Sequence, residues 1–289
     1  MKSSRNRGSE AQLAGQAVIR ADRATDVRRV LSVAVLGLLE VMVAGRLVVF
    51  TAGRLQTLLA VLAMSAGETV SVDYVAAAVW EGSLPADVRK TVQTYVTRLR
   101  AVLGAELIGT RPNGYVLHAE PDQVDALRFL RLVDAADAAP DVRAERTRLE
   151  EALALWRGMP FEGLRSGWLA DLEAPRLVER YLAAVERRAD LDLAAGRPGP
   201  LVGQLGELLA RHPLRESLWL RLLVALHRSG RRAEALQRYE AIRVHLAEEL
   251  GVDPGAELQR VYADLLADRA PAVTCRGCPL RDRSIAAAR

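Results

Sequence analysis

The chain has 289 residues, enough for about two domains that each bury a hydrophobic core. Half of the residues are hydrophobic, which indicates a folded and soluble protein. The net charge of +4, from 40 basic and 36 acidic residues, is too small to identify a polyanion binder by itself. The distribution of charge along the chain is therefore more informative than its sum.

The first 50 residues divide into a polar segment and an apolar one. Residues 1–29 are basic and lack an apolar core, so we expect a disordered extension and no secretory signal. The apolar stretch Leu31–Phe50 is interrupted by Glu40 and Arg46 and by a predicted turn at Ala44-Gly45. Its valine-rich halves favour strands over a membrane-spanning helix.

Three helices and a hairpin are expected in residues 54–118. The apolar pattern predicts helices at Arg54–Ser65 and Tyr74–Trp80, and Asp87 is placed to cap a third helix that ends near Gly104. Two short apolar stretches then flank Arg111–Gly114, where an Asn-Gly pair predicts the tip of a hairpin. Strands, three helices and a hairpin in this order are typical of a winged helix-turn-helix domain.

The third helix has one apolar and one basic face. Its apolar side chains fall within about 60° of one another on a helical projection; they are Val92, Val96, Leu99 and Leu103. The opposite side is basic and polar, and no acid occurs between Arg89 and Ala105. Arginine, glutamine and threonine suit base readout as well as phosphate contact. The sequence therefore predicts a helix that enters a DNA groove, with an ordinary solvated helix as the alternative.

Charge is segregated within this predicted domain. Residues 31–87 contain two basic and five acidic residues, whereas residues 88–118 contain five basic residues and Glu106 as their one acid. A neutral domain with one basic face meets a polyanion in a preferred orientation.

Beyond residue 120 the pattern becomes almost entirely helical. Proline and glycine interrupt it at intervals that predict helices of about 13 to 25 residues joined by short turns. One helix pair has tetratricopeptide spacing, with Trp219, Leu222, Ala235 and Tyr239 at the signature positions. We therefore expect an all-α domain of tetratricopeptide-like pairs, which offers a concave surface to partners.

Several segments, spread over both halves of the chain, carry a family resemblance. In the first half they are VLGLLEV at 35–41, TLLAVLAMSAGETVSVDYVAAAVW at 57–80, LPADVRKTVQTYVTRLRAVLG at 84–104 and TRPNGYVL at 110–117. In the second half they are RLEEALALWRGMPF at 148–161, HPLRESLWLRLLVALHRSGRRAEAL at 212–236 and EELGVDPGAELQRVY at 248–262. Together they resemble the Streptomyces antibiotic regulatory proteins in their small form.

The resemblance implies a mainly α fold with two domains. Residues 30–120 would form an OmpR-type winged-helix DNA-binding domain with a small β-sheet and a wing. Residues 121–268 would form an all-α, tetratricopeptide-like bacterial transcriptional activation domain, and residues 269–289 a disordered tail. The resemblance also implies an activator of secondary-metabolite genes that binds direct repeats in double-stranded DNA, as a dimer or higher oligomer, and recruits RNA polymerase holoenzyme.

The family's functional positions can be carried onto this sequence. Its DNA contacts fall on Arg54, Lys90, Thr94, Tyr95, Thr97, Arg98, Arg100 and the wing residue Arg111. The segment that faces polymerase falls on Trp80, Glu81, Gly82, Ser83, Leu84, Pro85, Ala86 and Asp87. Gln56 stands where the family commonly has an arginine.

No group of residues has the spacing of a catalytic site, so we expect no enzyme activity and no cofactor. Cys275 and Cys278 form a single CRGC without further ligands for zinc, and free thiols indicate a reducing compartment. We therefore expect a cytoplasmic, nucleoid-associated protein with no membrane partner. Two alternatives remain open: a helical interaction scaffold whose winged helix binds protein, and a DNA-binding repressor.

Overall fold

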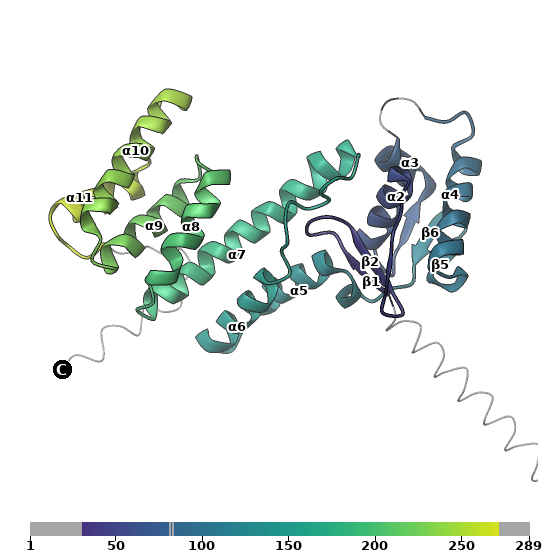
Figure 1. Cartoon of the computed structure of the whole chain (residues 1–289), viewed down its shortest axis with the longest axis horizontal. Coiled ribbons are helices and arrows are strands. Elements are labelled where there is room, and N and C mark those ends of the chain that lie inside the picture. The colour runs from purple at the N-terminus through teal and green to yellow at the C-terminus, as the bar shows by residue number, and fades with distance from the viewer. Residues whose placement is uncertain (1–30, 81, 83, 272–289) are drawn as a thin grey trace, which may run out of the picture. The chain divides into compact units, whose positions relative to one another are not determined.

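The computed structural model describes residues 31–80, 82 and 84–271, which form two compact units (Figure 1). The first unit ends at Tyr181 and the second begins at Leu182. Residues 1–29, Glu81, Ser83, Cys275 and Cys278 lie outside the described residues, so the expectations placed on them are not addressed by the structure.

Among the described residues, the first unit contains two small antiparallel sheets and eight helices or helical turns, followed by the start of α7. Its elements are β1 (Leu31–Ala34), β2 (Glu40–Val43), β3 (Arg46–Val48), α2 (Gly53–Met64), β4 (Thr69–Ser71), α3 (Val72–Val79), α4 (Val88–Leu103), η1 (Ala105–Leu107), β5 (Ile108–Arg111), β6 (Gly114–Leu117), η2 (Pro121–Gln123), α5 (Asp125–Asp137), α6 (Val142–Leu153), the π-helical turn η3 (Leu169–Glu173) and the start of α7 (Ala174–Ala194). The strand orders are β1-β2-β3 and β4-β6-β5.

The apolar stretch at the start of the described chain forms the first sheet, as predicted. β2 and β3 pair with Val43 opposite Arg46, and the two residues between them, Ala44 and Gly45, have φ of 50° and 73°. Two positive φ values in a two-residue loop are the signature of a type I′ hairpin turn. None of the helices in the described ranges is long and apolar enough to cross a bilayer.

The three predicted helices are confirmed, and α2 is the centre of the winged-helix core. Every residue from Leu58 to Ala63 is at most 1% exposed, which is typical of a helix that is covered on all sides. The apolar face of α4 is also confirmed, because its four predicted core residues are all buried. Asp87 caps α4 by accepting a hydrogen bond from the Lys90 backbone N–H at 2.9 Å.

The wing is the β5–β6 hairpin, and its turn differs from the prediction by one residue. Arg111 pairs with Gly114, so the two-residue tip is Pro112-Asn113 and the predicted Asn-Gly tip is wrong. Gly114 belongs to β6, where a Cβ atom would lie only 1.9 Å from the Val70 carbonyl oxygen. Glycine is therefore required for the close approach of β4, a third strand that the sequence pattern did not predict.

The helices that follow the wing pack onto the winged helix within the first unit. Val33 forms a parallel bridge with Val124, and both carboxylate oxygens of Asp125 accept backbone hydrogen bonds, from Val35 at 2.7 Å and Leu36 at 3.0 Å. The buried Ser166 hydroxyl donates to the Ala78 carbonyl of α3 at 2.7 Å. These long-range contacts explain why residues 121–181 cluster with the winged helix; the domain boundary expected at residue 120 stays a prediction.

The second unit is all-helical in its described residues. It contains the remainder of α7, α8 (Gly199–Arg211), α9 (Glu216–Arg228), α10 (Arg232–Leu250) and α11 (Ala256–Leu266). Glycines end two of these helices: Gly230 follows α9 and Gly251 follows α10, with left-handed φ of 75° and 67°. Three of the four signature residues are buried: Leu222, Ala235 and Tyr239. The signature residues lie on α9 and α10, which pack against each other as the predicted tetratricopeptide-like pair. The Tyr239 ring of α10 also stacks on Tyr262 of α11 with centroids 3.9 Å apart.

Candidate nucleic-acid interface

The solvent-facing side of α4 is basic and free of acids. The exposed residues of α4 are Arg89, Lys90, Gln93, Thr94, Thr97, Arg98, Ala101 and, in the last turn, Val102. Among the described residues, no carboxylate forms an ion pair with Arg89, Lys90, Arg98 or the wing residue Arg111. Arg89 and Gln93 were not among the positions carried over from the family, although helical periodicity places them on the same face. The uncompensated positive charge of this face is available to a polyanion.

The two predicted threonines hold their hydroxyl protons within the helix. Thr94 Oγ1 donates to the Lys90 carbonyl and Thr97 Oγ1 donates to the Gln93 carbonyl, each at 2.9 Å. A hydroxyl has one proton, so toward a further partner these oxygens act as acceptors. The methyl groups are the part suited to a thymine methyl.

A row of aromatic rings orients two of the predicted arginines. Trp80 and Tyr95 meet edge to face with centroids 5.8 Å apart, the Arg54 guanidinium lies 6.0 Å from the Trp80 ring, and the Arg98 guanidinium lies 5.8 Å from the Tyr95 ring. Contacts of this kind stabilise by about 0.5–1 kcal/mol at exposed sites. Tyr95 is half-buried and supports the Arg98 side chain. Trp80 is only 7% exposed, so it lies beneath the loop between α3 and α4 and not on its surface.

Arg100 is placed differently from the other basic residues of α4. Its Nε and Nη2 donate to the Ile108 carbonyl at 2.9 and 2.7 Å, and Nη2 also donates to Thr110 Oγ1 at 2.8 Å. These three bonds join α4 to β5, which lies beside it (Figure 1). Arg100 therefore holds the wing against the helix, a role that helical periodicity alone could not reveal.

The wing is held on its other side as well. The Asn113 carbonyl at its tip accepts a hydrogen bond from the Val72 N–H at 3.2 Å, and β6 pairs with β4. Arg111 is exposed at the end of β5. A hairpin fixed on both sides presents this arginine at a defined position relative to α4.

The loop between α3 and α4 contains the predicted polymerase contacts. Its described residues Gly82, Leu84, Ala86 and Asp87 are exposed and Pro85 is half-buried; Leu84, at 59% exposed, is its large apolar side chain. Asp87 is committed to the cap of α4. Gln56, at the position where the family commonly has arginine, uses its Nε2 to donate to the Phe50 carbonyl at 2.9 Å.

Comparison with known proteins assigns the two halves of the chain to different domain families. Residues 47–117 match the model of the transcriptional regulatory protein C-terminal domain, and residues 124–266 match that of the bacterial transcriptional activator domain. Regulatory protein DnrI of Streptomyces peucetius is 35% identical over 226 residues, which are 73% of this chain and 83% of DnrI. The chain belongs to the Streptomyces antibiotic regulatory protein family.

Other members of this family differ in length. AfsR of Streptomyces griseus is 39% identical over 216 residues, but the match spans only 22% of AfsR. The solved structure of Mycobacterium tuberculosis EmbR in complex with a low affinity phosphopeptide has a TM-score of 0.75 and 30% identity, covering 83% of this chain and 65% of that chain. These relatives are named as regulators, so transcription regulation is the class of function that the family supports.

Proposed function

We propose that the chain is a sequence-specific DNA-binding activator of secondary-metabolite genes, with α4 in the major groove and Arg111 of the wing in the minor groove. The observation that carries the proposal is the acid-free face of α4 beside a wing that Arg100 holds in place. Lys90, Thr94, Thr97 and Arg98 would supply base and phosphate contacts, and Tyr95 would support Arg98. This division of roles follows the surroundings of each side chain.

Assembly on DNA and contact with RNA polymerase complete the proposed function. Direct repeats would be occupied by subunits in head-to-tail order, because repeated sites in one orientation require a heterologous contact. Residues 30–120 would bind DNA, and residues 121–268 with the exposed loop would contact RNA polymerase. The protein would accordingly be found on the nucleoid.

Genome-wide occupancy of the tagged full chain tests the DNA-binding proposal. We expect enriched fragments that share a direct repeat near promoters, and their loss in the Arg98→Ala/Arg111→Ala double variant. Arg131→Ala is the matched control, because Arg131 is an exposed arginine of α5 that pairs with Asp122. Enrichment without a shared sequence, unchanged in the double variant, would favour the alternative of a protein-binding scaffold.

A loop variant tests polymerase recruitment separately from DNA binding. Asp87 is unsuitable, because its replacement also removes the cap of α4, which costs about 1 kcal/mol. Leu84→Ser removes an exposed apolar side chain and leaves the cap intact. We expect reduced transcription in vitro with unchanged DNA affinity; equal losses in both assays would contradict recruitment through the loop, and higher transcription would favour a repressor.

A further inference from the structure

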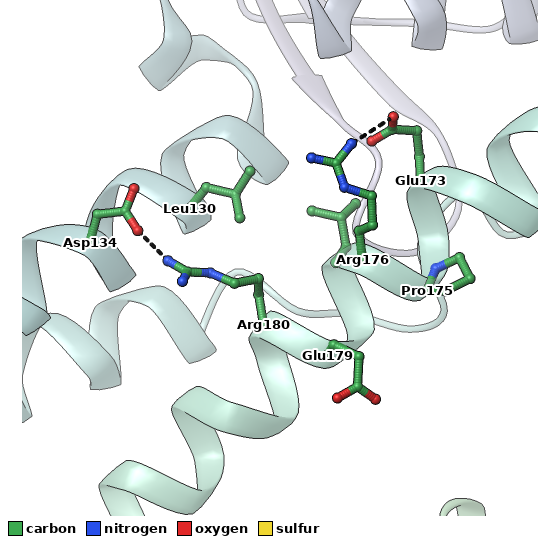
Figure 2. Close-up of a pocket in the computed structure, with 8 residues that line it drawn as sticks. Leu130, Asp134, Glu173, Pro175, Arg176, Glu179 and Arg180 are labelled. Atoms are coloured by element: carbon green, nitrogen blue, oxygen red, sulfur yellow. Dashed lines mark hydrogen bonds and ion pairs between the residues drawn. The ribbon is translucent and has the colours of Figure 1, made fainter. Parts of the chain in front are cut away.

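A pocket with a volume of about 610 Å³ lies in the first unit between α5 and the beginning of α7 (Figure 2). Ligand pockets of small molecules typically measure about 300–1,000 Å³, so the size suits a small organic ligand. The residues that line it are Leu130 and Asp134 of α5, Glu173 of η3, and Pro175, Arg176, Leu177, Glu179 and Arg180 of α7. None of these residues was identified as functional from the sequence.

The pocket combines apolar walls with two arginines on one helical face. Leu130, Pro175 and Leu177 supply hydrocarbon surface. Arg176 and Arg180 are four residues apart on α7, and side chains at this spacing are neighbours on a helix surface. Two neighbouring guanidiniums repel one another, and each has an acidic partner: Arg176 Nη1 contacts Glu173 Oε1 at 3.2 Å, and Arg180 contacts Asp134 (Figure 2).

These ion pairs are of a kind that a ligand can exchange. Arg180 and Asp134 are 41% and 69% exposed, and an exposed pair of this kind contributes only about 0–1 kcal/mol. Arg176 is 77% exposed, although its partner Glu173 is 15% exposed. A guanidinium has five N–H donors in a fixed fork that matches a carboxylate or phosphate. An anion between the two arginines would therefore relieve their mutual repulsion, and at Arg180 it would do so at little cost in lost pairing.

The acidic residues of the pocket do not favour a cationic ligand. Glu173 and Asp134 are each neutralised by an arginine, and the Glu179 carboxylate points away from Leu130 and Arg176 in Figure 2. A cation would have to compete with both arginines, which carry their charge at all accessible pH. Charge and shape thus point to the same class of ligand.

We propose that this pocket binds an amphipathic organic anion, whose apolar body packs on Leu130, Pro175 and Leu177 and whose carboxylate or phosphate group bridges Arg176 and Arg180. The proposal does not depend on DNA binding.

The pocket also adjoins the winged helix. Tyr74 of α3 packs edge to face against Trp168 with centroids 4.7 Å apart. Burial raises the pKa of Tyr74, the nearby Glu173 raises it further, and Arg176 lowers it, so both pocket residues lie within electrostatic reach of α3. An anion that draws Arg176 away from Glu173 therefore changes the charges that face α3.

Two matched fluorescent probes test the charge requirement on the full chain. 1-Anilinonaphthalene-8-sulfonate has apolar rings and one anionic group, and N-phenyl-1-naphthylamine is its uncharged counterpart. We expect Arg176→Gln and Arg180→Gln each to weaken sulfonate binding by about tenfold, the effect of one charge-assisted contact, while the neutral probe changes little. Leu130→Ser should weaken the binding of both probes, and Arg131→Gln should leave the binding of both unchanged.

Hydrogen exchange locates the bound sulfonate probe, which also binds exposed apolar surface elsewhere on proteins. We expect slower exchange in residues 125–137 and 169–181 of the wild-type chain and no such protection in the Arg176→Gln/Arg180→Gln variant. A double variant that binds the sulfonate as tightly as wild type would overturn the proposal. Protection confined to other segments would overturn it as well. A carboxylate and a phosphate monoester with the same apolar body then distinguish which anionic group the pocket prefers.

Discussion

Arginines have opposite surroundings in the second unit and on α4. In the second unit Arg221 forms two hydrogen bonds of 2.8 Å with the carboxylate of Asp190, and a third contact of 3.5 Å with Glu186. The side chains of Arg221 and Asp190 are only 13% and 8% exposed. On α4 and the wing, Arg89, Arg98 and Arg111 are exposed and form no ion pair with the described residues.

The difference shows why the net charge of the chain says little about its partners. An arginine that faces a buried carboxylate holds two helices together and contributes nothing to the outer field. An arginine without a carboxylate keeps its charge available to phosphates. Variants in each region can therefore separate folding from DNA binding.

The largest expected effect is on stability, at Arg221. Arg221→Ala removes both hydrogen bonds that the guanidinium donates to the buried Asp190 carboxylate, and we expect a loss of about 3–5 kcal/mol in the free energy of unfolding of the second unit. Urea denaturation followed by circular dichroism measures it. Arg238→Ala is the control, because its pair with Glu234 is exposed and 3.9 Å long, and it should cost at most about 1 kcal/mol. Equal costs for the two variants would contradict the distinction between buried and exposed ion pairs.

The next effect is on DNA affinity, at Arg98. Arg98→Ala should weaken binding to a fragment identified by genome-wide occupancy by about 1–3 kcal/mol if the arginine contacts a base. Because Arg98 is exposed and unpaired, the free energy of unfolding should change little. Fluorescence anisotropy and urea denaturation on the same preparation check both parts. If Arg98→Ala lowered the free energy of unfolding and left DNA affinity unchanged, Arg98 would stabilise the fold and would not contact DNA.

Arg100 should behave as an intermediate between the two classes. Arg100→Met keeps the aliphatic stem and removes the three hydrogen bonds to β5, so we expect a stability loss of about 1–2 kcal/mol. DNA affinity should fall because the wing is no longer held, but its salt dependence should change less than in Arg111→Ala. Anisotropy titrations at several salt concentrations distinguish the two variants. If Arg100→Met reduced the slope of log K against log salt by a full unit, Arg100 would instead contact a phosphate.

The smallest effect is a dependence on pH at Asp125. Burial raises its pKa, and hydrogen bonds from Val35 and Leu36 and the nearby Arg157 lower it only in part. Since the folded pKa is raised, the stability that this carboxyl contributes is greatest below its unfolded pKa and declines as pH rises through the folded pKa. Relative to Asp125→Asn, the wild type should therefore be more stable at about pH 4 than at about pH 7. An opposite trend in urea denaturation would contradict the burial argument.

The sequence predicted the local features of the winged helix well. Helical periodicity identified the buried face of α4, and Asp87 marked a helix start that the structure confirms. These features depend on residues within a few positions of one another. The resemblance to the family was confirmed by the relatives.

Features that depend on distant contacts were not predictable. β4 is a strand because β6 lies beside it, and the wing tip shifted because Gly114 meets Val70. Trp80 is buried and Arg100 is bonded to β5 because of how α2, α4 and the wing pack together. The pocket likewise joins Leu130 to residues that follow it by more than 40 positions. No single-sequence pattern contains such pairings.

The salt dependence of DNA binding tests the central claim most directly, namely that the unpaired arginines of α4 and the wing contact the DNA backbone or bases. Binding of the enriched fragment would be measured across a salt titration for wild type, Arg98→Ala, Arg111→Ala and the control Arg131→Ala. We expect each of the first two variants to bind more weakly and every lost phosphate contact to reduce the slope of log K against log salt by about one, while the control matches wild type. Affinities and slopes equal to wild type in both Arg98→Ala and Arg111→Ala would contradict it.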